Sequence, residues 1–119
     1  RCVIAYDGGP SVEKAITFLQ ENPLLSGIGI CLVRAGHIDD NAKWFLEEAA
    51  DKLSAAGYEV ESRATSGHPD KVISGIVENE AYDLLVMGAY GHSRIRQLFI
   101  GSTTTTMVRT CKIPVLMFR

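Results

Sequence analysis

Apolar runs of strand length alternate with segments in which apolar residues recur at helical spacing. The runs predict five β-strands, over Cys2–Tyr6, Gly29–Val33, Tyr58–Ala64, Leu84–Gly88 and Val115–Phe118. The periodic segments predict four helices, which start at Pro10, at Asp39 or Asp40, after Pro69 and at about Ser102. This alternation is typical of an α/β fold, in which a parallel sheet carries helices on both faces.

The predicted sheet is open and doubly wound, with five parallel strands. The nucleotide-binding version of such a sheet has strand order 3-2-1-4-5, and its ligand crevice lies at the switch point between the first and fourth strands. Asp7 follows the first strand and Gly88 ends the fourth. The topology therefore predicts that Asp7 and Gly88 lie side by side at the mouth of a crevice. The third strand alternates with charged residues, which favours a sheet edge.

The second predicted helix has recognisable signals at both ends. Asp39 and Asp40 offer side-chain caps at its start, and Gly57 can end it in a left-handed conformation. Trp44 lies off the apolar stripe of this helix, which predicts that its side chain is partly exposed. The predicted buried face consists of Ala42, Phe45, Leu46, Ala49, Ala50, Leu53 and Ala56.

Length and composition favour a single soluble domain over residues 1–119, with 46% hydrophobic and 22% charged residues. A net charge of −2 argues against a strongly basic nucleic-acid binder, and no apolar run approaches the roughly 20 residues that span a membrane. Because the chain begins at Arg1, we expect it to be trimmed from a longer or tandem protein. The three cysteines are odd in number and set among apolar residues, which favours free thiols in a reducing cytoplasm.

Basic residues and glycines gather in the last third of the chain. All 14 acidic residues precede Leu84, whereas five Lys and Arg residues follow it. Within this region, a glycine loop between Gly88 and Gly101 joins a strand to a helix start. Such a loop lets main-chain N–H groups approach an anion beside the positive end of the helix dipole. We therefore favour a phosphate cradle, with a tight turn and a basic surface face as the alternative.

The glycine spacing carries a resemblance to a known family. Gly88-x2-Gly91-x9-Gly101-Ser102 matches the signature G-x2-G-x9-G-[ST]. With the opening VIAYDGG and the closing IPVLMF, the whole chain resembles the nucleotide-binding branch of the universal stress protein family. The resemblance implies an α/β fold, binding of ATP or another adenine nucleotide, and frequent dimerisation. The second strand departs from the family, because it ends Leu32-Val33-Arg34 where many members have a His before the Val.

The resemblance places the phosphates of the nucleotide on the glycine loop. Gly88 would let the chain turn against the ribose, and Gly91 would clear space for the phosphates. Donors at the helix start would come from Gly101, Ser102 and Thr103. Three loop side chains could contact a phosphate or simply face solvent: His92, Arg94 and Arg96.

The resemblance places the adenine and ribose end of the site at the ends of the first, second and fourth strands. By resemblance, Asp7 faces this end, whereas an Asx turn or a cap for the first helix is the alternative. Ala5, Tyr6 and Met87 would line the same wall. Val33 would offer its main chain to the adenine edge, or serve as a core valine only.

No catalytic set is visible in the sequence. The chain has no G-x-S-x-G or H-E-x-x-H motif, and no Gly-Lys-Ser/Thr of a Walker A loop. The leading hypothesis is therefore adenine-nucleotide binding in a stress response, with ligand-dependent association as the output. An interaction domain without a functional nucleotide site is one alternative. A weak ATP hydrolase is the other, in which Asp7 and Mg²⁺ would position a water molecule.

The last strand suggests a protein partner. The run from Ile113 to Phe118 holds no charged residue, and we expect it at a sheet edge with unpaired main-chain groups. The family resemblance implies that a second copy in a homodimer, or the other domain of a tandem protein, covers this edge. The alternative is a strand that is capped only by solvent and Arg119.

Overall fold

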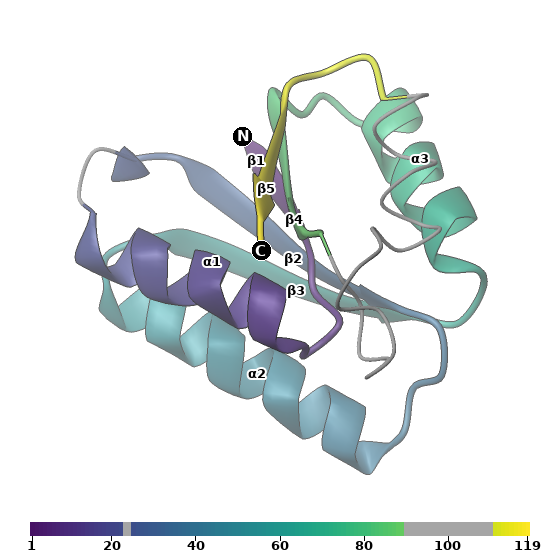
Figure 1. The fold of residues 1–119 in the computed structure, drawn as a ribbon, viewed down its shortest axis with the longest axis horizontal. Helices are drawn as coiled ribbons and strands as arrows, with labels where there is room; N and C mark the ends of the chain where they lie inside the picture. The colour runs from purple at the N-terminus through teal and green to yellow at the C-terminus, as the bar shows by residue number, and fades with distance from the viewer. Residues whose placement is uncertain (23–24, 90–110) are drawn as a thin grey trace.

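The computed structural model describes residues 1–22, 25–89 and 111–119 (Figure 1). The elements, in chain order, are β1 (Cys2–Ala5), α1 (Pro10–Glu21), β2 (Gly29–Ala35), α2 (Asp40–Ala55), β3 (Glu59–Thr65), α3 (Pro69–Asn79), β4 (Leu84–Gly88) and β5 (Val115–Phe118). These strands form one parallel sheet of order β3-β2-β1-β4-β5. The predicted fold class and strand order are confirmed. The helix expected from about Ser102 falls outside the described residues.

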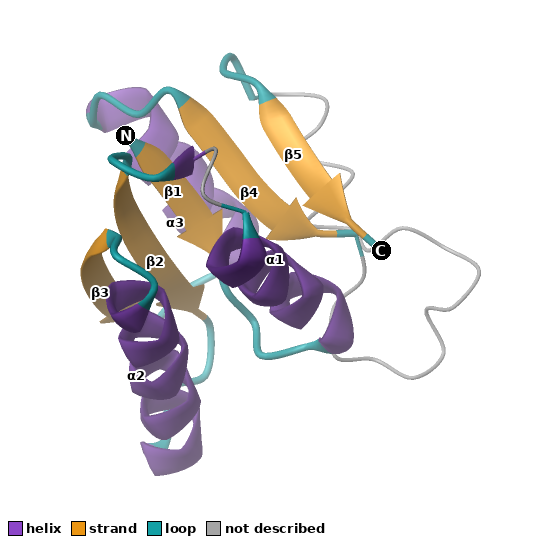
Figure 2. Cartoon of the chain, turned by 90° about the vertical axis from the view of Figure 1, so that its left-hand side faces the viewer, coloured by secondary structure: helices purple, strands orange, loops and turns teal. Residues whose placement is uncertain are grey.

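Helices cover both faces of the sheet. Figure 2 shows α1 and α2 on one face and α3 on the other. Side chains along β1 alternate between two cores: Ile4 packs with α1 and α2, whereas Val3 packs with α3. Burial on both faces explains why β1, β2 and β4 appear in the sequence as short apolar runs. None of the described helices combines the length and the apolar composition that a membrane crossing requires.

The ends of α2 follow the predicted capping signals. The Asp39 carboxylate accepts a hydrogen bond from the Ala42 main-chain N–H at 2.8 Å, as an N-cap does. Gly57 has a φ of +100° just past the helix. The Tyr58 N–H then donates a hydrogen bond to the Leu53 carbonyl at 3.1 Å, which satisfies a carbonyl of the last turn. Local sequence therefore determines where α2 begins and ends.

The prediction of the buried face was wrong at two residues, because Phe45 is exposed and Ala56 is an exposed cap residue just past the end of α2. Phe45 is 51% exposed and packs edge-on against Trp44, with ring centroids 5.0 Å apart. Consecutive residues point about 100° apart around a helix, so Phe45 and its neighbour Leu46 cannot both face the sheet. Leu46 takes the central position and Phe45 lies at the margin. The buried positions of the predicted face are Ala42, Leu46, Ala49 and Leu53.

The cysteines behave as small apolar residues. Cys2 and Cys31 are buried, Cys111 is half-buried, and all three thiols are free. Burial raises the pKa of Cys2 to about 12 and also raises the pKa of Cys31. Both thiols are therefore neutral at physiological pH, which removes their nucleophilic form.

An ion pair fastens the edge strand β3 to the end of α3. Arg63 donates from Nη1 and Nη2 to the two carboxylate oxygens of Glu80, at 2.7 and 2.8 Å, and from Nε to Glu61 at 2.7 Å. The hydrogen bonds from Arg63 lower the pKa of Glu80 below its ordinary value of 4.5. The folded state thus favours the ionised carboxylate, and the pair stabilises the fold where Glu80 is charged.

Replacing Glu80 should therefore change stability in a pH-dependent way. We expect Glu80→Gln to have a lower free energy of unfolding than the wild type at about pH 7. Because the folded-state pKa is depressed, this stabilisation is present above pH 4.5 and is lost as the pH falls through the folded-state pKa. The difference between the two proteins should shrink by about pH 3, in urea unfolding curves recorded at both pH values.

Glu78→Gln is the matched control, because Glu78 lies in the last turn of α3, just before Glu80, and forms no ion pair with a described residue. It should leave the stability nearly unchanged at both pH values. A deficit of Glu80→Gln that stays constant with pH would contradict the ion-pair explanation.

Candidate functional site

The candidate site lies where β1 and β4 end beside each other. The two strands are neighbours, with Ala5 level with Met87. The chain leaves β1 toward β2 on one side, whereas β5 flanks β4 on the other side. Such a divergence produces a switch point at the carboxyl ends of parallel strands, which is where ligands bind in this type of sheet. The strand adjacency that brings Asp7 and Gly88 to one edge is therefore confirmed.

A tight loop from Asp7 to Gly9 connects β1 to α1 at this edge. The Asp7 Oδ1 atom accepts a hydrogen bond from the Gly9 N–H at 2.8 Å, which forms an Asx turn. Gly8 has a φ of +77°, in the left-handed region that glycine tolerates best. The Asx turn named as the alternative for Asp7 is thus present. It holds the carboxylate in a defined position at the end of β1, and contact of Asp7 with a ligand stays a prediction.

Tyr6 presents mainly its main chain to this edge. Its side chain is buried, and its hydroxyl donates a hydrogen bond to the Glu13 carboxylate on α1. Burial, and then the bond to Glu13, raise the pKa of Tyr6, so the phenol is neutral at physiological pH. The Tyr6 N–H donates to the Val33 carbonyl at 2.8 Å and extends the β1–β2 ladder by one bond. The ring therefore belongs to the core beneath α1.

The other strand residues of the predicted base end supply an apolar surface. Val33 and Met87 are buried and Ala5 is half-buried, all on the face of the sheet that packs against α3. Because the Val33 carbonyl already accepts the Tyr6 N–H, it is engaged in the sheet. Any contact of these side chains with a ligand would be apolar, and their roles in nucleotide binding stay predictions.

Gly88 is required by packing. A Cβ atom added there would lie 2.7 Å from the Ser11 Cβ atom and 3.0 Å from the Val12 main-chain nitrogen. The first turn of α1 thus rests directly on the end of β4, with no room for a side chain between them. By resemblance, this glycine is predicted to lie against the ribose. The structure adds a separate reason for it, and the ribose contact remains a prediction.

Arg34 lies near the end of β2 and has a contact that the sequence did not predict. Its Nη1 atom donates a hydrogen bond to the main-chain carbonyl of Asp7. Its Nε atom is buried and has no hydrogen-bond partner among the described residues. A charged residue inside the apolar run GICLVRA was the available signal, because an arginine at a strand end that packs into the fold usually has a specific partner.

Several residues of the predicted phosphate cradle fall outside the described part of the chain. Their assignment therefore continues to rest on the glycine spacing and the family resemblance. They are Gly91, His92, Gly101, Ser102 and Thr103, together with Arg94 and Arg96.

The described residues restrict how a divalent ion could be held. Among them, no group of three or more His, Cys, Asp or Glu side chains could hold a metal ion. Asp7 brings a single carboxylate to the end of β1. Mg²⁺ typically combines one or two carboxylates with phosphate oxygens and water, so Asp7 fits such an ion only in company with a nucleotide.

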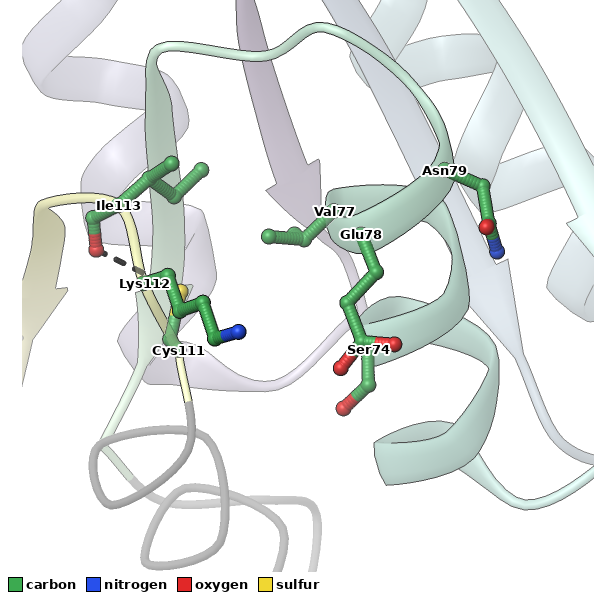
Figure 3. A pocket seen from close by; sticks show the side chains of 7 residues that line it. All are labelled: Ser74, Val77, Glu78, Asn79, Cys111, Lys112 and Ile113. Atoms are coloured by element: carbon green, nitrogen blue, oxygen red, sulfur yellow. Dashed lines mark hydrogen bonds between the residues drawn. The ribbon is translucent and has the colours of Figure 1, made fainter.

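A cavity of about 490 Å³ lies apart from this site, between α3 and the segment that precedes β5 (Figure 3). Glu78 and Lys112 extend from its two walls, and the Cys111 thiol donates to the Ile113 carbonyl at 3.4 Å. Because α3 ends and β5 begins here, the cavity lies toward the amino ends of the strands. It is therefore not part of the crevice at their carboxyl ends.

The fold defines a class: a parallel α/β domain whose strand order has a switch point between β1 and β4. The family model of the Universal stress protein family matches residues 1–119. Universal stress protein Slr1230 from Synechocystis sp. is 41% identical over 121 residues, which cover 100% of this chain and 42% of that protein. The chain belongs to the universal stress protein family.

The chain spans 42% of Slr1230. Its sequence alignment with MJ0577 from Methanocaldococcus jannaschii runs over 82 residues at 27% identity and covers 69% of this chain and 51% of that protein. The solved structure of MJ0577 has a TM-score of 0.85 and 21% identity, and the match covers 99% of this chain and 94% of that one. A universal stress protein solved in complex with cAMP has a TM-score of 0.77 and 28% identity, over 100% and 96% of the two chains.

Two further solved structures share the fold at lower identity. One is the universal stress protein from Archaeoglobus fulgidus in complex with dAMP, with a TM-score of 0.72 and 19% identity over 99% of this chain and 95% of that one. The other is a family protein from Arabidopsis thaliana with AMP bound, with a TM-score of 0.73 and 21% identity over 98% and 90%. At these identities the likeness establishes the fold alone.

The packing role of Gly88 can be tested by adding one methyl group. Gly88→Ala should lower the free energy of unfolding by about 1–3 kcal/mol, the usual cost of overpacking, because α1 must move away from β4. Chemical denaturation measures this difference. The control is Gly75→Ala on α3, where the new Cβ would meet only the Asn79 amide nitrogen at 4.0 Å. The control should be at least as stable as the wild type, and a Gly88→Ala protein of wild-type stability would contradict the packing argument.

Proposed function

We propose that this domain binds an adenine nucleotide, namely ATP, ADP or AMP, in the crevice at the carboxyl ends of β1 and β4. The observation that carries the proposal is the switch point itself, where a left-handed glycine and an Asx turn form the loop after β1. The relative solved with cAMP, at 28% identity over the whole chain, supports the same ligand class.

In this proposal, the ligand lies with its base and ribose toward β1 and β2 and its phosphates toward the segment after β4. The base end would be formed by Ala5, Tyr6, Asp7, Val33 and Met87. The phosphate end would be formed by Gly88, Gly91, His92, Gly101, Ser102 and Thr103. Mg²⁺, where it takes part, would bridge Asp7 and the phosphates.

We further propose a biological setting for this binding. The domain would act in a stress response through association that depends on the bound nucleotide. Cys2 and Cys31 are buried and form no disulfide, which supports a location in a reducing cytoplasm. Because the chain spans 42% of Slr1230, we propose that it is one domain of a longer or tandem protein.

The nucleotide proposal is tested by replacing Gly101, which the sequence predicts to lie at the start of a helix in the phosphate end. Gly101→Val should weaken ATP binding about tenfold or more, because lost hydrogen bonds to a charged group cost this much. Isothermal titration calorimetry measures the affinity of the wild type and the variant. Equal affinity in both would count against a phosphate site at this position.

The matched control is Gly29→Val, at the amino end of β2. A Cβ atom there would meet only the Arg1 side chain, at 4.0 Å, and a β-branched residue suits a strand. This variant should bind ATP as the wild type does. Failure of the wild type to bind ATP, ADP and AMP alike would end the proposal.

Association through β5 is a second candidate function. This strand is an edge of the described sheet, and it exposes Leu116 (37%) and Met117 (39%). Phe18 adds an exposed ring on α1, 5.5 Å from the ring of Phe118. An uncharged edge beside exposed apolar side chains is suited to pairing with another strand. The proposed partner is a second copy of this chain or the other domain of a tandem protein.

A charge placed on this edge should prevent association. We expect Leu116→Lys to shift the protein toward monomer in sedimentation velocity, because a lysine on an edge strand opposes strand pairing. Ser62→Lys places the same charge on the exposed edge strand β3 and should leave the distribution unchanged. A wild-type chain that stays monomeric at all concentrations, with and without ATP, would rule out the homodimer.

A further inference from the structure

We propose that Arg34 is a positioning residue, which holds the loop from Asp7 to Gly9 in the conformation that receives the ligand. This inference rests on the proposed nucleotide site. Its basis is the hydrogen bond from Arg34 Nη1 to the main-chain carbonyl of Asp7. Within the described part of the chain, it is the one side-chain bond from outside the loop that reaches the loop's main chain.

The bond acts on the least constrained point of the loop. Tyr6 is fixed from β2 by its N–H bond to Val33, and Gly9 is fixed by its N–H bond to the Asp7 side chain. Between them lies the peptide group that joins Asp7 to Gly8. Because Gly8 adopts both signs of φ easily, that peptide plane could rotate without steric penalty. The hydrogen bond from Arg34 holds the Asp7 carbonyl and so sets the orientation of the Asp7–Gly8 peptide plane.

The orientation of this plane determines where a donor points. In a trans peptide, the C=O and N–H groups point in opposite directions. Arg34 follows Leu32 by two residues, so it leaves β2 on the face of the sheet that carries α1 and α2. The Asp7 carbonyl is held toward Arg34, and the Gly8 N–H is therefore directed away from it. Arg34 thus determines the direction of the Gly8 N–H, which can donate to the ligand, although Arg34 itself does not contact the ligand.

Stability alone does not explain an arginine at this place. The Nε atom of Arg34 is buried without a hydrogen-bond partner among the described residues. Arg34 as a whole is half-buried, but a buried N–H without a partner costs free energy, and an apolar side chain of similar shape is often as stable. A residue that violates a packing rule in this way is characteristic of a functional site.

The test compares Arg34→Met and Arg34→Lys with the wild type in three measurements. These are ATP affinity by calorimetry, the free energy of unfolding, and amide hydrogen exchange of Gly8 and Gly9 by NMR. We expect Arg34→Met to weaken ATP binding about tenfold and to speed exchange at Gly9, with nearly wild-type stability. Arg34→Lys should restore part of the affinity, because it keeps a charged donor.

Arg63→Met is the matched control, since Arg63 also forms ion pairs on a strand but lies on β3 and bonds to Glu61 and Glu80. It should lower stability and leave ATP affinity unchanged. If Arg34→Met and Arg63→Met lose affinity only in proportion to stability, Arg34 is merely structural and the proposal is overturned.

Two further outcomes separate this inference from the proposed function. An Arg34→Met protein with wild-type ATP affinity and wild-type exchange at Gly9 overturns the inference and leaves the nucleotide site intact. If the wild type itself binds no nucleotide, the proposed function fails. Amide hydrogen exchange then tests whether Arg34 still holds the loop from Asp7 to Gly9. Faster exchange at Gly9 in Arg34→Met supports the hold of Arg34 on the loop, and unchanged exchange overturns it.

Discussion

The site depends on the contact between the first turn of α1 and the end of β4. A missing side chain at Gly88 lets Ser11 and Val12 rest on the strand, and this fixes where α1 begins. β1 and α1 anchor the two ends of the loop from Asp7 to Gly9, and a left-handed glycine completes the turn. One glycine therefore serves packing and, in the proposed site, also leaves the crevice open. A glycine signature should not be assigned to ligand contact alone.

The two edges of the sheet have opposite chemistry. On β3, Glu59, Glu61 and Arg63 place charge along the edge, and Arg63 is tied back to α3 through Glu80. Charged edges oppose pairing with other strands. On β5, the strand itself has no charge and exposes apolar side chains. This asymmetry indicates that only one side of the sheet is suited to a partner, and that side lies next to β4, which borders the candidate crevice.

The helices and strands were predictable from the sequence because the signals for them are local. Alternating cores on β1, the cap at Asp39 and the left-handed glycine at Gly57 each depend on residues within one or two turns. The missed features are non-local. Phe45 was placed on a buried face because helical periodicity does not say which of two neighbouring apolar residues meets the sheet. Arg34 escaped notice because its partner, the Asp7 carbonyl, is 27 residues away in the chain.

By itself, the sequence determined the class of fold, because strand and helix periods and capping signals are local, and the usual strand order of that class then predicted the order of this sheet. Only the tertiary structure decided what each residue does at the carboxyl ends of β1 and β4. It buried the Tyr6 ring against Glu13, used Asp7 for a turn and placed Arg34 on the carbonyl of that turn. Such roles arise from the packing of one element on another, because contact between distant segments is set by three-dimensional shape and leaves no periodic trace in the chain.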